Sequence, residues 1–450
     1  MIGAKLVLLV VLGQVPSSDA AALVAKLGAG RYADREAAST ALERMGQQAL
    51  PALRAAASAR DPEVRTRAGA IVARIEGSLL TKPTLVTLDF QDRPIADVAR
   101  SLSEQAGIKL ALFPENLPTW QSKITLRDTT PITFWNAIDR FCDAANLQYN
   151  EGATNGREPI LPLFYGGGRA AGPISDQGPF RVRLVNLHYQ RDVNFQPAPR
   201  VASPPVAPAG RLTSSPAASS GVLTEQFFAQ VQIVAEPRLS LQKTGELKVL
   251  EAIDDRGQSL VAPGTISQRH SGYNSAVIPG SALPVQATLV RPKEPGVSIR
   301  KLRGMVPITV RMRKPNPLVV TLANSAGKSF HNDDVVLNIV DVKANPQSNQ
   351  TSIELAIRGG DSQSQNDQAP GAAAEDFVPH RPDRFQQQIE VVDAQGRAIP
   401  WYHSGFADES RMTITLMPND PGSAPAQLRY YGLARASTEV TFEFTDVPMP

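Results

Sequence analysis

The spacing of apolar residues changes along this chain, and that change constrains the fold more than any other feature. Up to about residue 80, apolar side chains recur every three or four positions, as at Ala68, Ile71 and Ile75. From about residue 180 they alternate with polar ones, as at Phe180 and Val182. A spacing near 3.6 is typical of helices, and a spacing of 2 is typical of half-buried strands. The 450 residues therefore predict a multi-domain α+β protein with helices first and antiparallel strands last.

Residues 21–80 are expected to form the helical part. The run from Ala49 to Leu53, followed by Asp61-Pro62-Glu63-Val64-Arg65, resembles a HEAT repeat. That resemblance covers about one and a half units, whereas such repeat proteins usually need about three. We therefore expect a small helical cap that packs on its neighbour, with an unrelated helical hairpin as the alternative.

Residues 84–155 switch between the two spacings in a definite order. Alternation from Val86 to Phe90 predicts a strand, and the stripe that follows Pro94 predicts a helix closed by Gly107. Two further strands, a helix after Pro131 and a last strand follow. The order βαββαβ requires two helices packed on one face of a small sheet.

This segment resembles the short N-terminal domain of secretins and TonB-dependent receptors. The resemblance rests on the run from Val86 to Val98, on Leu102-x-Glu104-Gln105-x-Gly107-Ile108, and on Ile124-Thr125-Leu126-Arg127-Asp128. It implies a periplasmic module that docks other proteins and has no catalytic residues. No series of ~10-residue amphipathic strands typical of a membrane barrel follows. The resemblance therefore implies only an exported interaction module, and neither secretion nor transport.

The remaining residues predict two tandem antiparallel β-sandwiches, 179–323 and 326–450, after a Gly-rich linker at 156–178. The Asp254-to-Gly257 turn is matched by Asp393-to-Gly396, which indicates an internal repeat. Strand number and turn spacing resemble immunoglobulin-like sandwiches, although the Cys…Trp…Cys core is absent. Two low-complexity stretches, 196–221 and 359–376, are expected to be mobile loops.

The N-terminus, residues 1–20, is typical of a secretory signal peptide. Lys5 precedes an apolar run from Leu6 to Leu12, and small residues up to Ala20 follow. An ordinary N-terminal core helix is the alternative. No later stretch approaches the ~18 apolar residues of a membrane-spanning helix. We therefore expect an exported protein, periplasmic or extracellular, with no transmembrane span in its mature chain.

Composition argues against several kinds of site. A single cysteine excludes an intramolecular disulfide framework and Cys-based metal centres, and the five histidines are scattered. Ala326-Gly327-Lys328-Ser329 lacks the first glycine of a phosphate loop, because Leu322 stands in its place. A net charge of +3 is too small to indicate nucleic acid. We expect no catalytic, metal or cofactor-binding residue.

Two weak binding candidates remain, an aromatic pair and a basic strand face. Trp401 and Tyr402 could stack on sugar rings, and Arg311 and Arg313 share one face of a strand that could contact an anionic envelope polymer. The leading hypothesis is an exported, non-enzymatic scaffold that binds another envelope or secreted protein. A polysaccharide- or peptidoglycan-binding protein is the first alternative, and a hydrolase with a site built from distant carboxylates is the second.

Overall fold

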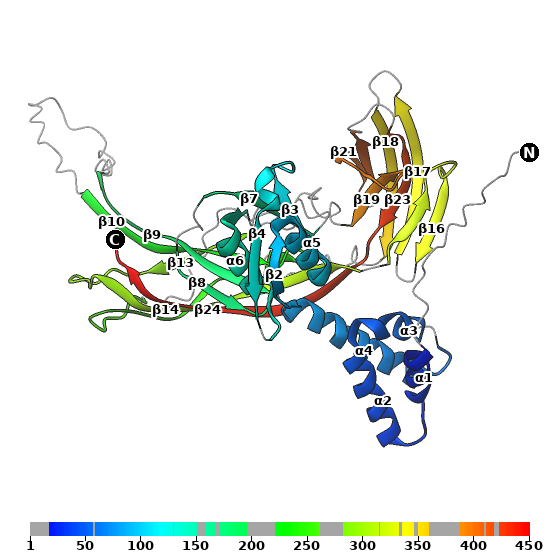
Figure 1. Cartoon of the computed structure of the whole chain (residues 1–450), viewed down its shortest axis with the longest axis horizontal. Helices are drawn as coiled ribbons and strands as arrows, with labels where there is room; N and C mark the ends of the chain where they lie inside the picture. Colours follow the sequence, from blue (N-terminus) through cyan, green and yellow to red (C-terminus); the bar gives the residue numbers. More distant parts are fainter. Residues whose placement is uncertain are drawn as a thin grey trace, which may run out of the picture. The chain divides into compact units, whose positions relative to one another are not determined.

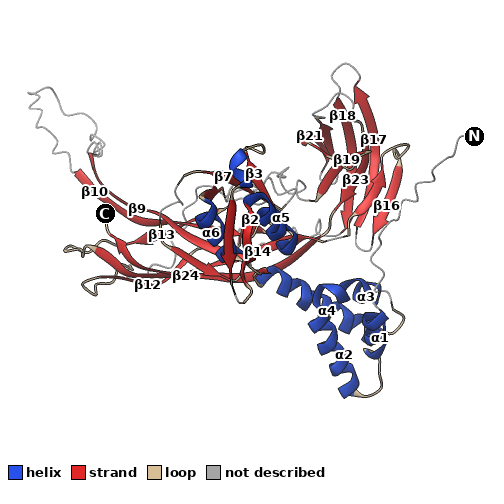
Figure 2. Ribbon diagram, in the orientation of Figure 1, coloured by secondary structure: helices blue, strands red, loops and turns tan. Residues whose placement is uncertain are grey.

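The computed structural model describes residues 18–56, 59–128, 130–150, 159–167, 172–195, 221–261, 282–314, 316–332, 335–345, 350–359, 388–408, 411–417 and 423–450. The protein is of the mixed α+β class, with several antiparallel sheets (Figure 2). Its contacts form two units (Figure 1). Unit 1 comprises Met1–Pro83 and Val310–Ala436, and unit 2 comprises Thr84–Thr309 and Ser437–Pro450. The expected leader and low-complexity loops lie outside the described residues, apart from Ser18–Ala20, Gly221 and Gly359.

The helical segment belongs to unit 1 and packs around a core that includes Leu42, Leu53 and Ile71. Asp61 caps the longest helix, because its Oδ1 accepts a hydrogen bond from the backbone N–H of Glu63 at 2.8 Å. None of the described helices has the length and apolar character needed to cross a membrane. The helices are α1 (Ser18–Lys26), α2 (Tyr32–Met45), η1 (Gly46–Ala49), α3 (Leu50–Ala55) and α4 (Pro62–Thr81).

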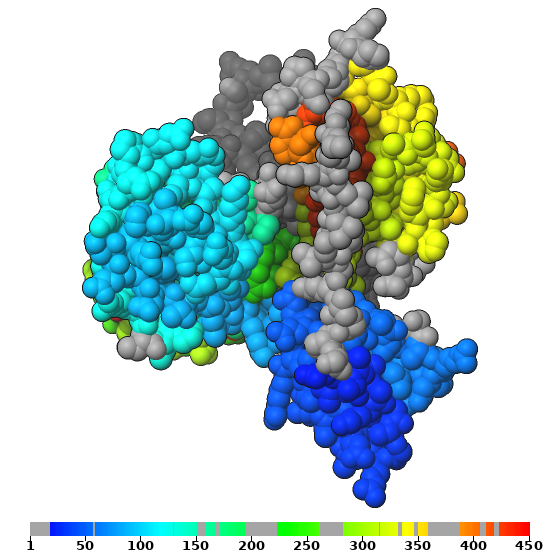
Figure 3. All heavy atoms as spheres, turned by 45° about the vertical axis from the view of Figure 1, so that its right-hand side comes forward, coloured from blue at the N-terminus to red at the C-terminus, as the bar shows by residue number. Residues whose placement is uncertain are grey.

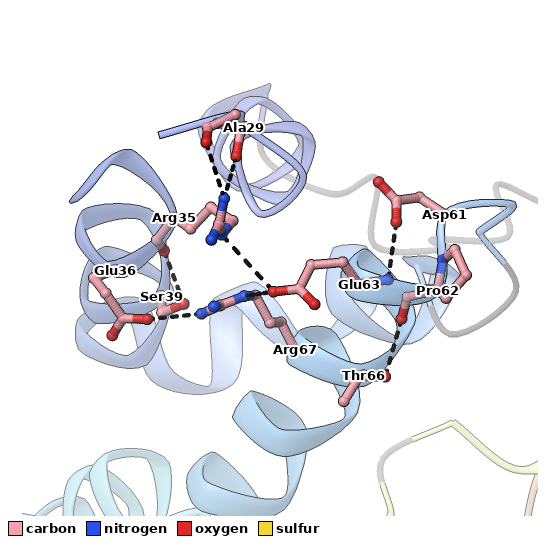
Figure 4. Close-up of polar contacts among 10 residues, drawn as sticks. Ala29, Arg35, Glu36, Ser39, Asp61, Pro62, Glu63, Thr66 and Arg67 are labelled. Atoms are coloured by element: carbon pink, nitrogen blue, oxygen red, sulfur yellow. Dashed lines mark hydrogen bonds and ion pairs between the residues drawn. The ribbon is translucent and has the colours of Figure 1, made fainter. Parts of the chain in front are cut away.

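Two arginines, one near the start of α2 and one near the start of α4, make the same contact (the first is drawn in Figure 4). Arg35 Nη1 donates to the carbonyl oxygens of Ala29 and Gly30, at 2.8 and 3.3 Å. Arg65 Nη1 donates to those of Ala59 and Arg60, at 2.8 and 3.0 Å. The pairs α1/α2 and α3/α4 thus hold their connecting loops in the same way.

The α+β segment belongs to unit 2 and contains the expected helices between short strands. Figure 3 shows one face of this segment in light blue and cyan. Its core contains Trp135, Phe141 and the lone cysteine, Cys142, which is buried. The elements are β1 (Leu85–Val86), β2 (Asp89–Pro94), α5 (Ile95–Ala106), β3 (Lys109–Phe113), η3 (Pro118–Gln121), β4 (Lys123–Arg127), β5 (Ile132–Thr133), α6 (Phe134–Ala145), β6 (Leu147–Tyr149) and β7 (Ile160–Tyr165).

The structure places strands where the sequence indicated a Gly-rich linker. β7 (Ile160–Tyr165) lies between β3 and β6, parallel to the first and antiparallel to the second. β8 (Ile174–Gln177) pairs with the strand that follows it. Leu161 and Leu163 of β7 are buried in the core of the α+β segment. This burial explains why residues next to a run of glycines form a strand.

The first β region, also in unit 2, has two sheets. One has the order β13-β10-β9-β8, and the other has the order β11-β14-β12 with β24 beside β14. Residues 437–450, which the sequence grouped with the second sandwich, lie in unit 2 and belong to β24 and its end. The remaining strands are β9 (Phe180–Phe195), β10 (Gly221–Ala235), β11 (Ser240–Lys243), β12 (Lys248–Asp254), β13 (Leu283–Leu289), β14 (Ser298–Arg313) and β24 (Leu433–Pro448).

Packing explains why the last strand returns to this region. Val440, Phe442 and Phe444 alternate along β24 and are almost fully buried. Gly304 of β14 leaves room for the Phe442 ring, since a Cβ at Gly304 would lie 2.4 Å from Phe442 Cζ. The backbone N–H of Met449 donates to the carbonyl oxygen of Val297 at 3.0 Å.

The second β region, in unit 1, also has two sheets. Their orders are β15-β23-β19-β20 and β16-β17-β18-β22-β21, and their core includes Leu337, Ile353 and Trp401. The strands are β15 (Leu318–Thr321), β16 (Lys328–Asn332), β17 (Val335–Asn345), β18 (Gln350–Gly359), β19 (Ile389–Asp393), β20 (Ala398–Ile399), β21 (Trp401–Asp408), β22 (Arg411–Leu416) and β23 (Pro425–Tyr430).

Candidate interaction surface

The aromatic pair that the sequence singled out does not form one stacking platform. Trp401 is 4% exposed in the core of the second β region, and its Nε1 donates to the carbonyl oxygen of Ile389 at 3.3 Å. Tyr402 is 42% exposed on the opposite face of β21. Because neighbouring residues of a strand point to opposite faces, only one of the two rings is open to a ligand.

The basic candidates lie at the end of β14 that belongs to unit 1. The Arg313 guanidinium lies over the Tyr431 ring, 4.6 Å from its centroid. Tyr431 donates its hydroxyl hydrogen to Glu390 at 2.9 Å, and Glu390 also accepts from Arg429 at 3.3 Å. Burial, followed by the hydrogen bond to Glu390, raises the pKa of Tyr431. Arg311 is half-buried in the same strand. Arg313 thus contributes to a network of side chains within unit 1.

Asp254 and Asp393 both have lowered pKa values, and both hold turns. Asp254 Oδ1 accepts from the backbone N–H groups of Arg256 and Gln258, at 3.1 and 2.7 Å. Asp393 Oδ1 accepts from those of Gln395 and Arg397, at 2.9 and 2.8 Å. The sequence repeat therefore corresponds to the same turn geometry in both β regions. In each turn the glycine has φ near +80°, namely +80° at Gly257 and +79° at Gly396.

The second carboxylate oxygens of these aspartates have different partners. Asp254 Oδ2 accepts from the backbone N–H of Gly296 at 3.1 Å and from Gln258 Nε2 at 3.0 Å. Asp393 Oδ2 accepts from Arg397 Nε at 2.7 Å and Ser423 Oγ at 3.1 Å. Burial alone would raise both pKa values, but these hydrogen bonds outweigh it and lower them. Both carboxylates are therefore held as structural acceptors. Within the described ranges no group of three or more His, Cys, Asp or Glu residues could hold a metal ion.

An exposed aromatic cluster lies at the end of the parallel strands β3 and β7. Phe113 and Phe164 are 39% and 36% exposed, and their rings stack with centroids 5.7 Å apart. Tyr165, the next residue of β7, points to the opposite face, where it is 46% exposed and meets the buried Trp120 edge to face at 6.1 Å. We call Phe113 and Phe164 the aromatic patch. Exposed aromatic side chains grouped on one surface are typical of protein-binding sites.

Local contacts hold the aromatic patch in place. Phe113 and Phe164 are direct partners in the register of β3 and β7. Trp120 Nε1 donates to the carbonyl oxygen of Pro114 at 2.7 Å, which ties η3 to the residue after Phe113. Beyond Tyr165, the backbone N–H of Gly166 donates to the carbonyl oxygen of Asn146 at 3.0 Å. The patch thus stands on paired strands whose ends are hydrogen-bonded.

A buried arginine joins the α+β segment to the first β region. The Arg181 side chain in β9 is 0% exposed and donates from all three of its nitrogens. Nε and Nη2 contact the two oxygens of Asp176, at 2.8 and 2.7 Å, and Nη1 and Nη2 contact those of Asp139, also at 2.8 and 2.7 Å. Nη1 also contacts the Tyr149 hydroxyl. These contacts use the five N–H groups of a guanidinium. Burial opposes the charge, but the bonds to Asp176 and Asp139 outweigh it and raise the pKa of Arg181.

Two further contacts cross the same junction. Trp135 Nε1 of α6 donates to the carbonyl oxygen of Pro179 at 3.1 Å, and the Arg181 guanidinium lies 5.1 Å from the Trp135 ring. Glu236, 0% exposed, accepts from Thr84 N at 2.8 Å, from Thr84 Oγ1 at 2.6 Å and from Arg238 Nε at 2.7 Å. The α+β segment is therefore fastened to the first β region through α6 and through its first residue.

The aromatic patch was not among the sites expected from the sequence. Phe164 and Tyr165 were assigned to a linker because three glycines follow them. The apolar run Ile160-Leu161-Pro162-Leu163 before them was the signal for a strand. Its parallel pairing with β3, which brings Phe113 beside Phe164, depends on residues far apart in the chain.

No family model, curated protein or solved structure matches this chain.

Proposed function

We propose that this chain is an exported, non-enzymatic envelope protein that acts as a scaffold, and that its α+β segment binds a partner protein through the aromatic patch. The observation that carries the proposal is the exposed stack of Phe113 and Phe164 on a segment fastened by buried contacts. A surface that is already ordered costs little conformational entropy when a partner binds.

The resemblance of residues 84–155 to the secretin and TonB short domain supports the same role, because that domain docks other proteins. The proposal assigns export to the leader-like residues 1–20. It assigns a HEAT-like fold to the helical segment and immunoglobulin-like folds to the two β regions, which act as spacers or binding modules.

The test is a cross-linking pull-down with the tagged full-length protein in bacterial envelope extract. The double variant F113S/F164S removes the stacked rings from the patch. The matched control is V319S/V336S in the second β region, where Val319 and Val336 are 48% and 39% exposed. We expect a partner that the wild type and the control recover and the patch variant loses.

Two results would count against the proposal. Equal recovery of the partner by F113S/F164S would move the binding site away from the aromatic patch. Recovery of nothing but the protein itself, at low and at high salt, would remove the scaffold role. Circular dichroism of each variant checks that a loss of binding does not reflect unfolding.

A further inference from the structure

Strands β9 and β10 form a two-stranded ribbon that extends past the sheet to which they belong (green, Figure 1). They pair antiparallel from Phe180↔Ala235 to Phe195↔Gly221. β8 accompanies β9 only up to Arg183, and β13 accompanies β10 only from Phe227 onward. Among the described residues, no strand pairs with the outer edge of β9 beyond Leu184.

This outer edge lacks three of the devices that commonly protect edges, although it carries the charged Arg191 and Asp192. Exposed edge strands are commonly blocked by proline, by lysine or by a very short length. From Asn186 to Phe195, β9 contains neither proline nor lysine, and it is continuous over that length. A bulge at Val185 separates it from the part that β8 covers. A ribbon of two strands is marginal alone in water, and a further strand would stabilise it.

The edge sequence is complementary to itself when it is reversed about Gln190. If two copies pair antiparallel about a two-fold axis through Gln190, the numbers of two opposed residues sum to 380. The two residues of each pair then lie on the same face of the joined sheet. Leu187 then meets Val193, His188 meets Asp192, and Tyr189 meets Arg191. These are an apolar pair, a pair of a histidine with a carboxylate, and an aromatic–guanidinium pair, all favourable across strands.

The flanking residues continue this symmetry, since Asn186 is opposed by Asn194.

Neighbouring registers give less favourable pairs. An axis through Arg191 sets that guanidinium against itself, and an axis through Asp192 does the same with two carboxylates. An axis through Tyr189 sets Leu187 against Arg191. Like charges that face each other across strands are unfavourable, so the register about Gln190 is favoured.

Several of the side chains involved are exposed, whereas Tyr189 is half-buried with the Arg291 guanidinium 4.4 Å from its ring centroid. Gln190 and Arg191 are exposed, and Val193 is 53% exposed. Within the ribbon, Arg191 pairs with Glu225 at 3.3 Å, and Gln190 Nε2 donates to Asp192 at 2.8 Å. These contacts run along β9 or across to β10. A further strand would pair with the backbone edge of β9 that faces away from β10.

We propose that two copies of this chain associate through antiparallel pairing of their β9 edges about Gln190. The two four-stranded sheets then join into one continuous sheet across an isologous two-fold interface. The partner is thus a second copy of the chain, selected by the self-complementary sequence from Leu187 to Val193. This inference is independent of the proposed function, since the aromatic patch takes no part in it.

The first test uses charge at the symmetry axis in the full-length protein. Because residue 190 faces its own copy, Gln190→Lys sets lysine against lysine and Gln190→Glu sets carboxylate against carboxylate. We expect sedimentation velocity to show a wild-type dimer whose dissociation constant each variant raises by about tenfold or more. An equimolar mixture of the two variants brings opposite charges together and restores the dimer.

The matched control is Gln226, the partner of Gln190 on β10, which lies on the other strand of the ribbon. The variants Q226K and Q226E add the same charges to the same ribbon away from the β9 edge. We expect both to dimerise as the wild type does.

The second test is a cross-link at the same position. Directly opposed residues of antiparallel strands have Cα atoms about 4.5–5.5 Å apart, within the span of about 4.4–6.8 Å that a disulfide bridges. Q190C is therefore expected to form a covalent dimer under mild oxidation, whereas Q226C stays monomeric on denaturing gels. The one native cysteine, Cys142, is buried and does not interfere.

Several results would overturn the proposal. One is a wild-type protein that stays monomeric across the micromolar range. Another is a Q190K and Q190E mixture that dimerises no better than either variant alone. Cross-linking of Q226C as fast as Q190C, or a dimer lost with Q226K and kept with Q190K, would place the interface elsewhere.

Discussion

The two β regions share a turn geometry but hold their charged side chains in different surroundings. In the first region, the side chains of Arg181 and Glu236 are 0% exposed, and both bind residues of the α+β segment. In the second region, Arg397 is 60% exposed and binds the buried Asp393 four residues before it, which also accepts from two backbone N–H groups and a serine hydroxyl. The first region therefore uses charge to hold another part of the chain, and the second uses it to hold its own turn.

This difference shows what a buried charge does in each place. An ion pair in water contributes little, because solvent screens it and its side chains lose freedom. A buried charge that loses its partner is expensive, since the remaining charge is left without solvent. The junction in unit 2 should therefore depend on a few residues. The turn in unit 1 should lose less stability without Arg397, because the buried Asp393 keeps three uncharged donors.

The largest expected effect comes from removing the buried guanidinium. Arg181→Met keeps much of the side-chain volume but leaves Asp139 and Asp176 without their cation. We expect it to lower the free energy of unfolding by about 3–5 kcal/mol. The comparison variant, Arg397→Met, removes an exposed cation from a carboxylate that keeps three uncharged donors, and it should lower stability much less. Chemical denaturation measures both. Equal losses in the two variants would contradict the distinction between the regions.

A smaller effect is expected from two matched glycine substitutions. Gly304→Ala places a methyl group 2.4 Å from Phe442 Cζ, against a buried ring, and should destabilise unit 2 by about 1–3 kcal/mol. Gly432→Ala in unit 1 places it 3.3 Å from Lys314 Cδ, on a flexible side chain that can move away. We expect Gly432→Ala to change stability much less. Thermal unfolding measured side by side tests this order.

The smallest expected effect is the pH dependence of stability that the two turn aspartates, Asp254 and Asp393, contribute. The pKa of each is lowered in the folded protein, so each stabilises the fold above its unfolded pKa of about 4, and this stabilisation is lost as pH falls through the lower folded pKa. Asp254→Asn and Asp393→Asn should therefore each weaken the fold at pH 7 and reduce its further loss of stability in acid.

The two aspartate substitutions should respond differently to added salt. The donors to Asp254 are uncharged, whereas Asp393 also binds the Arg397 guanidinium. Added salt should therefore reduce the effect of Asp393→Asn more than that of Asp254→Asn. Denaturation at pH 3 and pH 7, in low and high salt, measures both dependences. An identical response to salt would remove this distinction between the turns.

Much of the local structure could be predicted from the sequence, because it depends on near neighbours. The stripe that begins at Ile95 predicted α5, and the matched Asp-x-x-Gly runs predicted two turns that the structure shows with the same hydrogen bonds. The mixed α+β class followed from the change of spacing.

What the sequence did not show depends on partners far along the chain. The alternation at Phe442 and Phe444 predicted a strand but not the sheet that would bury it. Trp401 looked like a ligand-binding residue because its burial depends on strands that lie elsewhere in the chain. The aromatic patch likewise arises only when β7 lies beside β3.

The return of the last strand has a consequence for the order in which the protein folds. The residues of unit 1 from Val310 to Ala436 lie in the chain between Thr309 and Ser437, both of unit 2. During synthesis, the second β region can therefore fold before β24 has been made. Until β24 arrives, β14 pairs, among the described strands, only with β11 and β12, and the space beside Gly304 has no phenylalanine to fill it. A chaperone that shields the part of β14 that β24 later covers would act during this interval, and slow release of the final residues would prolong it.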